Sequence, residues 1–222
     1  MFPDGTRQRR AHNPRMLTLY YAPGTCALAS HLALEYTGAP YQTVRLNFKE
    51  QQQRSAEYLK LNPKGRVPAL VTDRGVLTET PALLQYIAQS FPQANLAPLD
   101  DVFLLAKMNE FNSYICSTVH VNHAHGARAS RWTDDAAAME TMKQKVPQTM
   151  GDAFGLIESQ MLQGPWVLGE CFSTSDLYLY TLTRWLEGDK VDVKRFAKVA
   201  DHMQRMEAQP QVKKVLEAQG AR

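Results

Sequence analysis

The hydrophobic and polar positions at the start of the chain follow the patterns of strands and helices in turn. Residues 17–35 predict a short apolar strand, a Pro-Gly turn and an apolar helix that begins at Cys26. Residues 41–46 alternate with a period of two, which predicts a second strand. The polar segment of residues 49–61 predicts a short, exposed helix.

A hairpin and a third helix complete the first unit. Residues 66–72 and 76–78 flank an Asp-Arg-Gly turn and predict two paired strands. Thr80 is the expected N-cap of the next helix, and Pro81 is its expected first helical residue. The pattern predicts β-α-β-α-β-β-α over residues 16–90.

The second half of the chain has a different pattern. Proline and polar residues in 91–98 interrupt the apolar periodicity, so we expect a linker at residues 91–100. Residues 101–222 are helical in pattern throughout. Ser173 and Asp176 have the spacing of a capping box at the start of one of these helices. The fold class is therefore an α/β domain followed by an all-α domain.

Composition narrows the class of protein. Of 222 residues, 44% are apolar and 21% are charged, which excludes a wholly disordered chain. No apolar run approaches the roughly 18 residues of a membrane span, so we expect no membrane partner. Three cysteines without metal-type pair spacing indicate a reducing compartment, and we expect a cytoplasmic protein.

The net charge of +3 comes from the N-terminal extension. Residues 1–15 hold four arginines and one aspartate, so the other 21 basic and 21 acidic residues cancel. A neutral body has no electrostatic footprint for nucleic acid. We expect residues 1–15 to be a disordered extension; a mis-assigned start before Met16 and an Arg-rich targeting peptide are the alternatives.

Cys26 is the main candidate for chemistry. A thiol at a helix N-terminus faces unpaired N–H groups and the positive end of the helix dipole, both of which favour the thiolate. We therefore expect a reactive Cys26. The alternative is an inert cysteine packed under the sheet.

Four motifs in order resemble the cytosolic glutathione transferases, most closely the bacterial beta class. They lie at residues 20–28, 62–68, 77–80 and 172–176, and so span nearly all of the chain after residue 15. The resemblance implies a thioredoxin-like N-terminal domain packed on a helical domain, with the active cleft between them. It also implies a homodimer, glutathione as co-substrate, and no metal.

The resemblance assigns roles to residues of the first domain. Cys26 would lie beside the glutathione sulfur and form a mixed disulfide with it. The backbone of Val67, before an expected cis-Pro68, would pair with the extended tripeptide. Glu79 would meet the ligand's ammonium, and Thr80, at a helix N-terminus, its α-carboxylate.

The resemblance also suggests site residues at positions where the sequence matches the class less closely. His120 matches the histidine of the class that contacts glutathione, and its natural role is hydrogen bonding and proton transfer near sulfur. Gln51 stands where the class usually has a lysine, and Ser113 stands near the place of an asparagine. Ser117 is a further glutathione-binding candidate. Tyr21 either donates its hydroxyl to the thiolate or packs as an ordinary strand residue.

Several polar and aromatic residues of the helical half have two interpretations. His120, His123 and His125 suggest a metal site, but only two share a helix face and no carboxylate or cysteine joins them. A second group consists of Arg128, Arg131 and Trp132. We expect these residues to form either a solvated helix end or the border of the second-substrate pocket. A pocket border would favour an anionic or aromatic co-substrate. The core of the helical domain is expected to include Tyr178, Tyr180, Trp185 and Leu186.

The function that follows is a glutathione-dependent transferase. It would conjugate glutathione to hydrophobic electrophiles or exchange it with disulfides through Cys26, so its partner is a small electrophile or a disulfide. One alternative is a glutathione-linked disulfide oxidoreductase with little conjugating activity. Another is a non-catalytic glutathione-transferase-like binding or regulatory protein.

Overall fold

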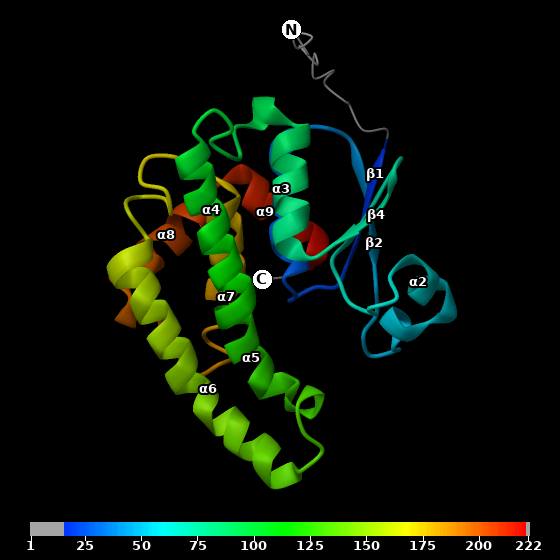
Figure 1. Ribbon diagram of the computed structural model, residues 1–222, viewed down its shortest axis with the longest axis vertical. Coiled ribbons are helices and arrows are strands. Elements are labelled where there is room, and N and C mark those ends of the chain that lie inside the picture. The colour runs from blue at the N-terminus through cyan, green and yellow to red at the C-terminus, as the bar shows by residue number, and fades with distance from the viewer. Residues whose placement is uncertain (1–15, 221–222) are drawn as a thin grey trace, which may run out of the picture.

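A four-stranded sheet carries the first unit of the protein. The computed structural model describes residues 16–220 and orders the strands β2-β1-β3-β4 (Figure 1). The central strand β1 (Leu17–Tyr21) pairs parallel with β2 (Tyr41–Arg45) and antiparallel with β3 (Ala69–Thr72). The hairpin is closed by β4 (Gly75–Thr78), antiparallel to β3. The predicted strands and hairpin are confirmed.

Two helices of the first unit pack together beside the sheet, and a third, shorter helix places the ring of Tyr58 5.6 Å from that of Tyr20 on the central strand. Every residue of α1 (Ala27–Thr37) up to Leu34 is buried, because α1 contacts β1 and α3 as well as helices of the second unit. An apolar surface all round a helix is what such a position requires. The others are α2 (Ala56–Leu61), preceded by a 3₁₀ turn, and α3 (Thr80–Ser90).

The second unit is helical and lies to the left of the sheet in Figure 1. A continuous helical segment consists of α4 (Val102–Tyr114), a π-helical turn (Ile115–Val119) and α5 (His120–Ala127). The remaining helices are α6 (Ala136–Leu156), α7 (Thr174–Thr183), α8 (Ala197–Ala208) and α9 (Pro210–Gln219). Within residues 16–220, no helix is long and apolar enough to cross a membrane.

Two expectations about local structure need correction, and a third concerns residues outside the described range. Thr80 is not the N-cap of α3: it is the first helical residue, and Glu79 occupies the cap position with a φ of 74°. The polar segment 49–61 is not one helix, since it divides into a 3₁₀ turn (Gln52–Arg54) and α2. The extension expected at residues 1–15 lies outside the described residues.

The two units are tied together through α1 and α9. Lys214 on α9 forms an ion pair of 2.6 Å with Glu35 on α1. Further along the same helices, the side chains of Gln219 and His31 meet at 2.9 Å and are both buried. These contacts fix the helical unit against the sheet unit and therefore fix the cleft between them.

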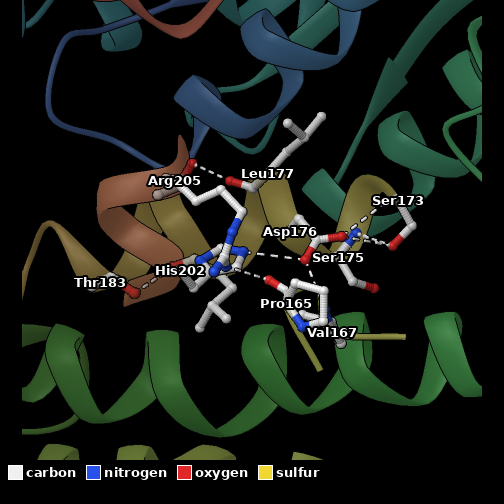
Figure 2. A network of polar contacts seen from close by, with 11 residues as sticks. Pro165, Val167, Ser173, Ser175, Asp176, Leu177, Thr183, His202 and Arg205 are labelled. Carbon is white, nitrogen blue, oxygen red and sulfur yellow. Dashed lines mark hydrogen bonds and ion pairs between the residues drawn. The ribbon is translucent and has the colours of Figure 1, made fainter. Parts of the chain in front are cut away.

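Asp176 organises the core of the helical unit (Figure 2). Its carboxylate accepts hydrogen bonds of 2.8 Å from the backbone N–H groups of Val167 and Ser173. His202 Nε2 lies 3.1 Å away, and both side chains are fully buried. The capping box predicted from Ser173 and Asp176 is confirmed. One carboxylate thus fixes the start of α7, the preceding loop and α8.

Candidate functional site

A cleft of about 200 Å³ lies where the two units meet. The sheet unit contributes the turn before α1, the loop before β3 and the start of α3. The helical unit contributes the π turn, α5 and the 3₁₀ turn that follows (Ala129–Arg131), together with Tyr178 of α7 and Trp185 just after that helix. The site is therefore assembled from segments that are far apart in the sequence.

Cys26 lies in this cleft at the N-cap position of α1. Its side chain is 7% exposed, and its thiol lies 3.7 Å from the carbonyl oxygen of Val67, to which it can donate. Burial raises the pKa of the thiol above the ordinary value of 9.0, although hydrogen bonding to Thr80 and the charge of Arg128 act in the opposite direction. The expectation of a thiolate is wrong for the protein as it stands.

The local backbone gives the reason. The hydroxyl of Thr25 accepts a hydrogen bond of 3.3 Å from Ala27 N–H at the start of α1. The carbonyl groups of Thr25 and Cys26 accept from the next two amides, at 3.1 and 3.2 Å. These three N–H groups of the first turn already have partners. The backbone N–H of Cys26 still lowers the pKa of its thiol, but desolvation by burial outweighs it.

Buried side chains hold the loop that presents Val67. The Val67-Pro68 peptide bond is cis, as the resemblance implied. Tyr58 and Asn62 both donate side-chain hydrogen bonds to the carbonyl of Arg66, at 2.6 and 2.7 Å. Because Tyr58 and Asn62 are buried, they hold the segment leading into Val67 in one position.

Glu79 and Thr80 lie where β4 leads into α3. Glu79 has a positive φ of 74°, which is uncommon for a residue other than glycine and is characteristic of functional positions. Its carboxylate is 2.6 Å from the ammonium of Lys64, and both side chains are about half exposed. Thr80 is buried at the N-terminus of α3, where backbone N–H groups favour an anion.

His120 faces the sheet unit from the first position of α5. Burial lowers the pKa of His120 to about 4, and the nearby positive groups, of which Arg128 contributes most, lower it further. The imidazole is therefore neutral near pH 7. Its ring meets that of Trp185 edge-on, at 5.1 Å between centroids.

Six of the predicted site residues come together in the cleft: Cys26, Val67, Pro68, Glu79, Thr80 and His120. Four others are not among its described lining residues. The Tyr21 side chain is buried in the core with its ring 5.4 Å from that of His31. The remaining three, Gln51, Ser113 and Ser117, are exposed.

Several lining residues were not predicted as site residues. Tyr178 and Trp185 were expected in the core of the helical unit, and both also line the cleft. Cys116 lies four positions before His120, a spacing that places two side chains on one helix face. That spacing was a usable signal. Arg54 and Arg66 had no comparable one, because both lie in loop and turn segments whose direction depends on the fold.

The three histidines considered for a metal site each contact another side chain of the protein. His123 Nδ1 is 2.8 Å from the carboxylate of Asp189, and its ring stacks on Trp185 at 4.2 Å. The ring of His125 lies 4.3 Å from that of Trp132. Over residues 16–220, no three His, Cys, Asp or Glu side chains group as an ion site would require.

Comparison with known proteins identifies the family. Models of the N-terminal and C-terminal domains of glutathione S-transferases match residues 15–89 and 122–219. Glutathione S-transferase GstA of Escherichia coli O157:H7 is 31% identical over 207 residues, which are 92% of this chain and 99% of that protein. The chain belongs to the glutathione S-transferase family.

Solved structures of the family share the whole fold. A glutathione transferase homolog from Sulfitobacter, crystallised with bound glutathione, is 44% identical with a TM-score of 0.89, covering 91% of this chain and 98% of that one. The beta class glutathione S-transferase of Sphingomonas chungbukensis is 29% identical with a TM-score of 0.80, covering 91% and 98%. These matches confirm the expected fold class, which is a thioredoxin-like domain followed by a helical domain.

Proposed function

We propose that this family member is a beta-like glutathione transferase whose cleft holds the glutathione sulfur against Cys26. The observation that carries the proposal is the position of the Cys26 thiol, which lies beside the Val67 carbonyl in the same cleft that Thr80 lines at the N-terminus of α3. The Sulfitobacter homolog, which is 44% identical, binds glutathione. The family resemblance also supports a homodimer.

The sheet side of the cleft suits an extended tripeptide. Backbone hydrogen bonds recognise extended peptides, and the Val67 peptide groups would pair with the cysteinyl residue of glutathione. The N-terminus of α3 at Thr80 would take the α-carboxylate. Glu79 would take the α-ammonium in place of its ion pair with Lys64.

Conjugation is the reaction that the protonation state of Cys26 supports best. Glutathione loses its thiol proton to solvent water, and the protonated Cys26 thiol donates a hydrogen bond to the resulting thiolate. The glutathione sulfur then forms a bond to an electrophilic carbon, whose leaving group departs with the bonding electron pair. Neutral His120 can also donate a hydrogen bond to the anionic sulfur.

Disulfide exchange is a second candidate, because the Cys26 sulfur itself lines the cleft. Deprotonated Cys26 would attack a glutathione-containing disulfide, form a mixed disulfide with glutathione and release the other thiolate. A second glutathione thiolate would then attack the mixed disulfide, release oxidised glutathione and regenerate Cys26. The raised pKa of Cys26 makes this route faster at alkaline pH.

Glu79→Gln tests the glutathione site. Removing the charge that meets the ammonium is expected to raise the dissociation constant of glutathione about tenfold, as expected for a charge-assisted hydrogen bond. Because the contact is the same in ground and transition states, kcat should change little. The measurements are titration calorimetry with glutathione and steady-state kinetics with chlorodinitrobenzene and with a small disulfide.

Glu57→Gln is the matched control, since Glu57 is an exposed carboxylate on α2 that does not line the cleft. It should leave the glutathione affinity unchanged. Equal affinities in the Glu79 variant and the control would remove Glu79 from the site. Glutathione binding without turnover of either substrate would identify a non-catalytic member of the family.

A further inference from the structure

The cleft has a large excess of positive charge. Five cationic side chains line it: Arg54, Lys64, Arg66, Arg128 and Arg131. Glu79 is the only carboxylate among its described lining residues, and Lys64 pairs with it. No ion pair within the described part of the chain joins any of the four arginines to a carboxylate.

Three of these arginines lie close to one another and to His120. The charges of Arg128 and Arg66 both lower the pKa of Arg131, after burial. Together with Arg131, the same two charges lower the pKa of His120. Each unit therefore directs guanidinium groups toward the same part of the cleft. Arg66 comes from the loop before β3, Arg128 from the end of α5 and Arg131 from the 3₁₀ turn that follows.

Glutathione does not neutralise this excess. Five cations and one carboxylate leave four positive charges in the cleft, because His120 is neutral. Glutathione with its thiol ionised brings two carboxylates, one ammonium and one thiolate, which is a net charge of two negatives. Two positive charges remain. They are placed best on Arg128 and Arg131, since the proposed peptide contacts at Val67, Glu79 and Thr80 lie on the sheet side.

An aromatic surface adjoins the arginines. Trp185 lines the cleft, its ring 5.1 Å from that of His120 and stacked on that of His123 at 4.2 Å. His123 is held in place by its 2.8 Å contact with Asp189. A fixed ring of this kind favours a flat apolar body next to the cationic groups.

From these features we propose that the second substrate is an aromatic electrophile that carries a carboxylate, held by Arg128 and Arg131 with its ring against Trp185. The proposal rests on the proposed function, because it concerns the co-substrate of the same cleft. Guanidinium groups are suited to it, since their planar fork bonds both oxygens of a carboxylate.

The test compares two non-reactive product analogues that differ by one charge. S-(para-carboxybenzyl)glutathione should bind at least tenfold more tightly than S-(para-carbamoylbenzyl)glutathione, its neutral amide of nearly equal shape. The preference should weaken as salt is raised. Calorimetry gives both dissociation constants, along with that of unsubstituted glutathione.

A double substitution, Arg128→Gln with Arg131→Gln, should reduce the preference to about twofold or less. The matched control replaces Arg45 and Arg74, two exposed arginines outside the cleft lining, and should keep the preference. Equal binding of the two analogues to the native protein would overturn the inference. So would a double variant that loses affinity for glutathione as strongly as for the carboxylate analogue, because the arginines would then hold glutathione itself. Failure of the native protein to bind glutathione would instead overturn the proposed function.

Discussion

Replacing Asp176 with alanine is expected to lower the free energy of unfolding by about 3–5 kcal/mol, the range found when one partner of a buried polar network is removed. The carboxylate is fully buried and accepts from two backbone N–H groups and the His202 ring. All three donors would lose their acceptor at once, and α7 would lose its capping box. The measurement is urea unfolding of the native protein and the variant.

Asp192→Ala is the matched control. Asp192 is an exposed aspartate at the N-cap of a 3₁₀ turn, where its carboxylate accepts from Lys194 N–H at 2.9 Å. Its loss should cost about 1 kcal/mol or less, because water replaces the lost acceptor. If Asp176→Ala cost no more than this control, the network in Figure 2 would not stabilise the helical unit.

The largest expected effect on activity is the loss of disulfide exchange in Cys26→Ser. A serine hydroxyl cannot form the mixed disulfide, so glutathione-dependent disulfide reduction should fall at least a hundredfold, to the rate without nucleophilic catalysis. Conjugation should fall less than tenfold, because the hydroxyl can still donate to the glutathione thiolate. Cys26→Ala removes that donor as well, and conjugation should then fall about ten- to a hundredfold.

The pH dependence gives an independent check on the same residue. Because the pKa of Cys26 is raised above 9.0, the rate of disulfide exchange should keep rising through pH 9 without a plateau. His120, with a pKa of about 4, should give no inflection between pH 6 and 8. Equal losses of both activities in Cys26→Ser, or a plateau below pH 8, would contradict this description of the thiol.

Local patterns were sufficient to predict most of the fold. Period-two alternation predicted β2, and the Ser173–Asp176 spacing predicted the capping box of α7. These features are determined by near neighbours in the sequence. The protonation state of Cys26 was predicted wrongly because it depends on burial between two units and on which groups Thr25 already pairs with.

The helical wall of the cleft illustrates a second limit. From the sequence, Arg128 and Arg131 fitted either a solvated helix end or a pocket border, because nothing local sets the direction of the chain after α5. Arg128 at the end of α5 and Arg131 in the 3₁₀ turn that follows (Ala129–Arg131) both line the cleft. Gln51 is the opposite case, because it was predicted as a site residue but is exposed, with a positive φ of 55°, and is not among the lining residues. Arg54, three residues later, was not predicted and lines the site.

Mapping the glutathione adduct tests the position of the glutathione sulfur most directly. The native protein, Cys26→Ser and Cys116→Ser would be incubated with oxidised glutathione at about pH 8.5, where more thiolate is present. Intact masses and peptide maps would then locate the adduct. Cys116 is the matched comparison, since it also lines the cleft and burial also raises the pKa of its thiol. We predict one reductant-reversible adduct at Cys26, lost in Cys26→Ser and kept in Cys116→Ser. No adduct, or one that persists in Cys26→Ser, would contradict a glutathione site centred on Cys26.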